Sequence, residues 1–183
     1  LSLPAGQGNG FKKEMETLIE TLKKKVPLIF ENENYLNKKK ELVEGFRNRQ
    51  AEMFREFEKK VNKEGFALVQ IQMGPYSRPG IFPMVEGNPV NIEQLETMVE
   101  ENKFSREELE RIKGKQAEMV NALEDIFKET RKSEKEIKDE LSALDTEMIS
   151  PAVKDSITDI KERFNYEIIH HYLDEVQEDI VAN

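Results

Sequence analysis

Two histidines and two carboxylates near the C-terminal end of the chain have a spacing that could bind a metal. Glu167 and His170 are three residues apart, as are His171 and Asp174, so each pair shares a helix face. Carboxylate–histidine pairs at this spacing bind iron or zinc in helical bundles. Such centres need a second Glu-x-x-His pair and further glutamates, and the chain has no other histidine. The pattern therefore favours helix histidines, and we expect no metal site.

A glycine-rich stretch, GQGNGFKK at 6–13, has the composition of a phosphate-binding loop. A P-loop requires glycine, four residues and then Gly-Lys-Ser/Thr, so that backbone amides and a lysine surround the phosphates. Here Phe11 stands where the second glycine belongs, and no Ser or Thr follows the lysines. Phe11 also replaces the third glycine of the dinucleotide pattern. We expect an extended entry loop over residues 1–10 and no bound cofactor.

Composition excludes several other classes of protein. Without cysteine the chain has no disulfides, Cys-type zinc sites or thiol chemistry, and no Ser-His-Asp arrangement is evident. The net charge is -9, but residues 12–63 carry +4 and residues 64–183 carry -13, which favours pairing between the two segments over nucleic-acid binding. No apolar run approaches the ~20 residues of a membrane span, and no signal peptide is visible. We expect a cytoplasmic protein that binds neither nucleic acid nor membrane.

The clearest candidate for a binding site is an apolar segment, FALVQIQMGPYSRPGIFPMV at 66–85, whose only charged residue is Arg78. Residues 66–73 and 81–85 are rich in β-formers, and GPYSRPG between them predicts a hairpin with a longer loop. Pro83 makes the second run an edge strand. A hairpin of this size cannot bury all its large side chains, and exposed Met and aromatic residues usually mark a binding surface. We expect the binding residues to be Phe66, Met73, Pro75, Tyr76, Ile81, Phe82 and Met84.

The rest of the sequence predicts helices that position this segment. Apolar periodicity, proline and glycine stops, and capping residues place them over residues 11–25, 34–63, 91–99, 105–148, 151–164 and 166–181. The first ends ahead of Pro27, and Pro151 starts the fifth. The stripe of the long helix alternates steps of three and four, as in a coiled coil, with polar residues such as Gln116 and Thr130 in its middle.

These lengths predict a mainly α fold. At 1.5 Å per residue, the helices over 34–63 and 105–148 span roughly 45 and 60 Å. We expect 11–63 and 105–148 to form a long antiparallel coiled-coil arm after the entry loop at 1–10. A small α+β tip that contains the hairpin would occupy 64–104, and the helices of 149–183 would lie at the base.

Four short motifs resemble, in their order, the helical insertion of Lon-related ATP-dependent proteases whose AAA+ module carries a long coiled coil. They are LPAGQG at 3–8, EGFAL at 64–68, MGP at 73–75 and YLDEVQEDI at 172–180. The run ETRKSEKEIKDELSALDTE at 129–147 is similar as well. The resemblance covers nearly the whole chain, although residues 148–171 depart from the pattern.

The resemblance implies a ring-forming protease whose ATP site and Ser-Lys dyad lie outside these residues. The beginning Leu-Ser-Leu-Pro, without an initiator Met, fits a piece of a longer protein. ATP and Mg would be cofactors of the parent, and the partners would be unfolded or misfolded substrates and other subunits of the ring. We expect a non-catalytic substrate-engaging or gating arm. The alternative is a structural coiled coil that holds ring subunits or a partner protein.

Overall fold

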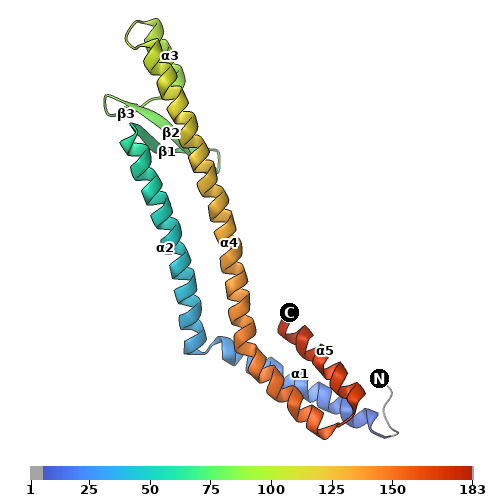
Figure 1. The fold of residues 1–183 in the computed structure, drawn as a ribbon. Helices are drawn as coiled ribbons and strands as arrows, with labels where there is room; N and C mark the ends of the chain where they lie inside the picture. Colours follow the sequence, from blue (N-terminus) through green and yellow to red (C-terminus); the bar gives the residue numbers. More distant parts are fainter. Residues whose placement is uncertain (1–5, 183) are drawn as a thin grey trace. The chain divides into compact units, whose positions relative to one another are not determined.

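The computed structural model describes residues 6–182 and confirms a mainly α fold with a small antiparallel sheet (Figure 1). The helices are α1 (Gly8–Phe30), α2 (Glu33–Lys63), α3 (Ile92–Glu100), α4 (Arg106–Arg163) and α5 (Glu167–Ala182), and the strands are β1 (Phe66–Met73), β2 (Tyr76–Val85) and β3 (Asn88–Pro89). In this part of the chain no helix combines the length and the apolar character needed to cross a bilayer.

The chain forms two compact units, and α2 and α4 contribute to both. Unit 1 contains the residues up to Glu44 and those from Glu136 onward; unit 2 is Gly45–Lys135. The core of unit 1 lies between α1, the C-terminal part of α4 and α5, and it buries Phe11, Leu18, Leu22, Val153, Ile157, Ile160, Ile169 and Leu173. Because all three helices supply apolar residues at helical spacing, each buries one stripe.

The start of α1 differs from the predicted entry loop. The part of the loop at residues 1–5 lies outside the described residues, but α1 already begins at Gly8. Phe11 explains the difference, since its N–H donates to the Gln7 carbonyl (3.0 Å) and its ring packs edge-on against Phe164, with 5.5 Å between centroids. Burial of this aromatic side chain offsets the poor helix propensity of the glycines on either side of Asn9.

Two prolines expected to interrupt helices lie inside them. Pro27 is in α1, and Pro151 is in α4, which runs unbroken to Arg163. A proline removes one helical hydrogen bond and costs about 3 kcal/mol or more in a helix interior. The residues after Pro151 offset this cost because they belong to the core of unit 1: Val153, Ile157 and Ile160 are almost fully buried. After Pro27 the helical bonding resumes, with the Glu31 N–H donating to its carbonyl at 3.0 Å.

Unit 2 combines the C-terminal part of α2 and the N-terminal part of α4 with the hairpin and α3. Its core buries Phe57, Val61, Phe66, Ile81, Met119 and Leu123. Within this unit α2 and α4 run antiparallel: the Phe54 and Phe127 rings are 6.1 Å apart, and Glu64 forms an ion pair with Lys115 at 3.3 Å. Helix α2 ends at Lys63, close to the predicted stop, and Gly65 follows with a φ of 82° that favours glycine.

The hairpin is tighter than predicted. Met73 pairs with Tyr76, so the connection is the two-residue turn Gly74-Pro75 rather than a loop over 74–80. Gly74 has a φ of 63°, and proline is restricted to negative φ, which is the combination found in a type II′ turn. The longer loop was a wrong prediction because residues 76–80 all find partners on β1 despite Pro79.

The second strand is also not an edge strand along its whole length. Sheet order is β1-β2-β3, with β3 pairing to Met84 and Val85 only. Pro83 is tolerated in this middle strand because β3 stops short of it and because its nitrogen faces away from β1. The backbone of Met84 faces β1, because its N–H donates to the Gly65 carbonyl (2.9 Å). Backbone groups alternate in direction along a strand, so the N–H and C=O groups of the odd-numbered residues of β2 face away from β1. Helix α3 then begins after Asn91, which forms the predicted cap.

Candidate binding surface

The two faces of the hairpin have different surroundings, because successive side chains of a strand point to opposite sides. On the inner face, Leu68 and Pro83 lie beside Phe66 and Ile81, the two strand residues that are buried in the unit 2 core. The other side, which we call the outer face, carries Ala67, Val69, Ile71, Met73, Tyr76, Arg78, Gly80, Phe82 and Met84. Eight of these nine residues are apolar or glycine, and Arg78 is the only charge.

Five of the seven predicted binding residues are on the outer face or in the turn next to it. Tyr76 is 77% exposed and Met73 61%; Met84 is exposed, Phe82 is half-buried, and Pro75 is exposed in the turn.

The other two predicted residues are in the core. Phe66 is 3% exposed and Ile81 4%, so the expectation that Ile81 faces water is wrong. Their register explains the outcome, since both occupy inner-face positions of the hairpin. Sequence reasoning missed Val69 and Ile71, although they follow from counting back in twos from Met73.

Gly80 lets two outer-face side chains lie close to the backbone of β2. A Cβ at this position would stand 2.5 Å from Cδ1 of Ile71 and 2.9 Å from Cε2 of Phe82, which are distances that real contacts do not reach. The Ile71 side chain therefore lies across β2 beside the Phe82 ring, while remaining 38% exposed. Ile71 and Phe82 thus pack together over Gly80, while Met73 and Tyr76 extend into solvent.

No protein-family model, curated protein or solved structure matches this chain. Function therefore has to be inferred from the side chains and backbone of the molecule itself. Besides the outer face, the two units contain a charged cleft, the histidines of α5 and an apolar groove.

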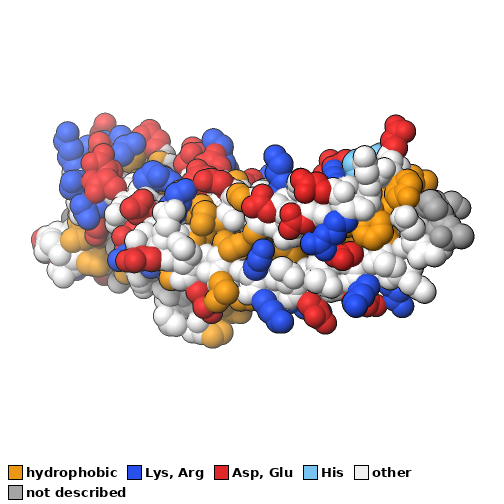
Figure 2. Space-filling view, turned by 90° about the horizontal axis from the view of Figure 1, so that it is seen from below, with side chains coloured by type: hydrophobic (Ala, Val, Ile, Leu, Met, Phe, Trp, Pro, Cys, Tyr) orange, Lys and Arg blue, Asp and Glu red, His pale blue; other side chains and the backbone are white. Residues whose placement is uncertain are grey.

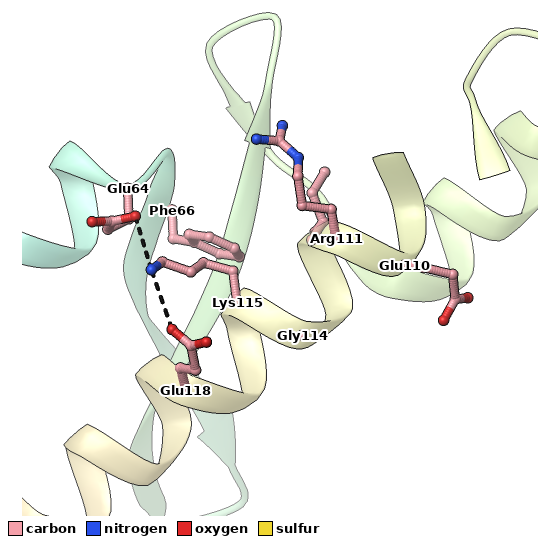
Figure 3. Close-up of a pocket in the computed structure, with 8 residues that line it drawn as sticks. Glu64, Phe66, Glu110, Arg111, Gly114, Lys115 and Glu118 are labelled. Atoms are coloured by element: carbon pink, nitrogen blue, oxygen red, sulfur yellow. Dashed lines mark ion pairs between the residues drawn. The ribbon is translucent and has the colours of Figure 1, made fainter. Parts of the chain in front are cut away.

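A charged cleft of about 420 Å³ lies next to the start of β1 (Figure 3). Lys115 extends over Phe66 and pairs with Glu118 at 3.2 Å and with Glu64 at 3.3 Å. Hydrogen bonds to Glu118 and then Glu64 raise the pKa of Lys115. The raised pKa keeps the Lys115 ammonium charged, and the side chain links α4 to Glu64, the residue that follows α2.

The histidines of α5 have separate partners. Nε2 of His170 lies 3.1 Å from the Lys161 carbonyl oxygen, and His171 pairs with Glu175 at 3.4 Å. Asp174 forms an ion pair with Lys161. Within residues 6–182 no group of three or more His, Asp or Glu side chains is arranged to hold a metal ion.

The Lys161–Asp174 pair carries a prediction about acid titration. The hydrogen bond from Lys161 lowers the pKa of Asp174. A carboxyl whose pKa is depressed in the folded state stabilises that state above its unfolded pKa, and this contribution disappears as the pH falls through the folded pKa. We expect NMR titration to give a pKa below the usual aspartate range and Lys161→Gln to raise it. An unchanged value in the variant would contradict the pairing.

An apolar groove of about 650 Å³ occurs in unit 1. Its lining comes from α1, α4 and α5 and includes Ile19, Leu22, Val26, Phe30, Ile149 and Ile180. Apolar side chains between charged ones are also visible on the face shown in Figure 2. The groove is formed by three helices and is a second apolar surface, separate in the sequence from the hairpin.

Proposed function

We propose that this chain is a non-catalytic substrate-engaging or gating arm of a Lon-like ATP-dependent protease, and that the outer face of the hairpin binds unfolded protein. The assignment to a Lon-like parent relies on the motifs at 3–8, 64–68, 73–75 and 172–180. The parent would be cytoplasmic and ring-forming, and it would supply the ATP and Mg site and the Ser-Lys dyad.

The observation that carries the binding proposal is the apolar outer face. Unfolded proteins expose the apolar side chains that folded proteins bury, and a surface without carboxylates accepts such segments with little dependence on their sequence. Each large side chain buried by a partner contributes about 1.5–3 kcal/mol before the costs of ordering. The paired backbone and the packing of Ile71 and Phe82 over Gly80 reduce the part of those costs that comes from the strands.

The groove of unit 1 supports the alternative function. A structural module that holds ring subunits or a partner protein needs an apolar surface for that partner, and the groove lined by α1, α4 and α5 provides one. In this alternative the chain would assemble normally after changes to the hairpin and lose its partner after changes to the groove. The two functions can therefore be separated by mutation.

The proposed function predicts that three outer-face side chains can be lost without affecting folding. We expect a triple variant, Ile71→Thr, Met73→Thr and Tyr76→Thr, to keep the parent's helicity and melting temperature, because threonine is a good strand residue and all three are exposed. Its binding to a permanently unfolded model protein should weaken tenfold or more, equivalent to 1.4 kcal/mol. Fluorescence anisotropy measures this change.

A matched control tests whether exposed apolar residues in general cause the binding. Leu28 and Leu36 in unit 1 are 65% and 50% exposed. The double variant Leu28→Gln and Leu36→Gln should bind the unfolded protein as the parent does. If the triple threonine variant folds and still binds with parental affinity, or if the control loses as much affinity, the outer face is not the binding surface.

A further inference from the structure

Strand β1 has an edge that pairs with no other strand among the described residues. Strand β1 is at one end of the sheet order, with β2 on one side only. The hydrogen bond from Met84 to Gly65 and the closing pair Met73–Tyr76 fix which backbone groups face β2. The N–H and C=O groups of Leu68, Gln70 and Gln72 consequently face away from the hairpin.

The side chains around this edge leave it uncovered. Residues Gln70 to Met73 are all exposed. The two glutamine side chains interact within the hairpin, since Gln70 Oε1 accepts from Ser77 Oγ and Gln72 Nε2 donates to the Gly74 carbonyl, both at 2.8 Å. The edge therefore presents the backbone donors and acceptors of Gln70 and Gln72 to solvent, and Leu68 next to them is half-buried.

The side of β2 that faces away from β1 is less open to an added strand. Pro79 and Pro83 have no N–H to offer on this side. The Ile81 carbonyl accepts from Nε2 of Gln116 (2.7 Å), and the Pro83 carbonyl accepts from the Val90 N–H (2.9 Å). Proteins usually protect sheet edges with proline, charge or bulges, and β1 has no proline, Lys, Arg, Asp or Glu from Phe66 to Met73.

We infer that an unfolded substrate segment binds to this hairpin as an added strand along β1. The inference rests on the proposed function and specifies how the segment is held. Backbone hydrogen bonds to Leu68, Gln70 and Gln72 require no particular sequence, which suits substrates that share none. Alternate side chains of the added strand extend the apolar outer face beside Val69 and Ile71.

Proline substitution on the edge tests the added strand. Gln70→Pro with Gln72→Pro removes two outward N–H groups but no hydrogen bond to β2. Proline is already present at the equivalent outward position across from Gln70, where Pro79 stands. The matched control, Gln70→Thr with Gln72→Thr, loses the same side chains and keeps the backbone donors. We expect the proline variant to bind the unfolded model protein at least tenfold more weakly, and the threonine control to bind within about twofold of the parent.

A measurement with a chemically modified peptide tests the added strand even if the proline variant does not fold. A short apolar peptide methylated at every backbone nitrogen has no N–H on either edge and cannot form the ladder with β1, so its affinity for the parent chain should fall at least tenfold relative to the unmethylated peptide. Equal affinities would overturn the added strand.

The outcomes separate this inference from the proposed function. If the outer-face triple threonine variant loses binding while the folded double-proline variant keeps it, substrate binding stands and the added strand is wrong. If neither variant loses binding, both are wrong. If sedimentation shows that the parent is a dimer and the double-proline variant a monomer, the edge pairs with a second copy of the chain, and its assignment to substrate is overturned.

Discussion

Replacing Ile81 with serine should destabilise unit 2 by about 3–5 kcal/mol, because the change removes a fully packed side chain and buries a hydroxyl. Ile81 is 4% exposed and packs with Phe57, Val61 and Met119. Its carbonyl also receives the hydrogen bond from Gln116, so a shift of the strand would leave a part-buried polar pair broken.

The same substitution at Tyr76 provides the matched comparison. Tyr76 belongs to the same strand but is on the outer face and 77% exposed. Tyr76→Ser should change the free energy of unfolding by less than about 0.5 kcal/mol. Urea denaturation followed by circular dichroism measures both variants. Equal costs at the two positions would contradict the division of the hairpin into an inner and an outer face.

The sequence was sufficient where the signals are local. Helix α2 was placed to within a residue because its apolar stripe is regular and Gly65 follows its end. The cap of α3 was also readable, since Asn91 and Gln94 exchange both hydrogen bonds of a capping box over three residues. Neither feature depends on tertiary contacts with the rest of the chain.

Proline was misleading for a physical reason. Sequence reasoning assigns it a local cost, but the actual outcome depends on how much apolar surface the continuing helix or strand can bury. Beyond Pro151 that surface includes Val153 and Ile157, and in β2 the outward nitrogen of Pro79 interrupts no bond to β1. A local rule cannot weigh such distant contacts.

The candidate surface was predicted in part. An exposed apolar hairpin followed from composition, but which residues face outward depends on the register, which the turn sets. With the turn assigned to residues 74–80, the period of two could not be aligned, and Ile81, which the structure buries, was included among the binding residues. The open edge of β1 could not be predicted from the sequence, because it depends on which strands pair.

The polar residues predicted in the middle of the long helix are found in α4. There, Oγ1 of Thr130 is buried without a hydrogen-bond partner among the described residues.

Truncating the helix–helix core of unit 2 is the second change with a large expected effect. Phe57→Ala and Leu123→Ala should each reduce the free energy of unfolding by about 2–5 kcal/mol. Phe57 is contributed by α2 and Leu123 by α4, and both are nearly inaccessible to solvent in one cluster. Because they belong to the same cluster, the double variant should lose less than the two single changes together.

A charged residue on the same helix supplies the control for these truncations. Arg55 pairs with Glu52 at 2.8 Å, and both side chains are more than half exposed. An exposed pair at this spacing contributes less than about 1 kcal/mol, since water and salt screen it. Arg55→Ala should therefore leave the urea midpoint almost unchanged, while Phe57→Ala two residues away lowers it strongly. If Arg55→Ala were the more damaging change, the apolar stripe would not be the main source of stability in this unit.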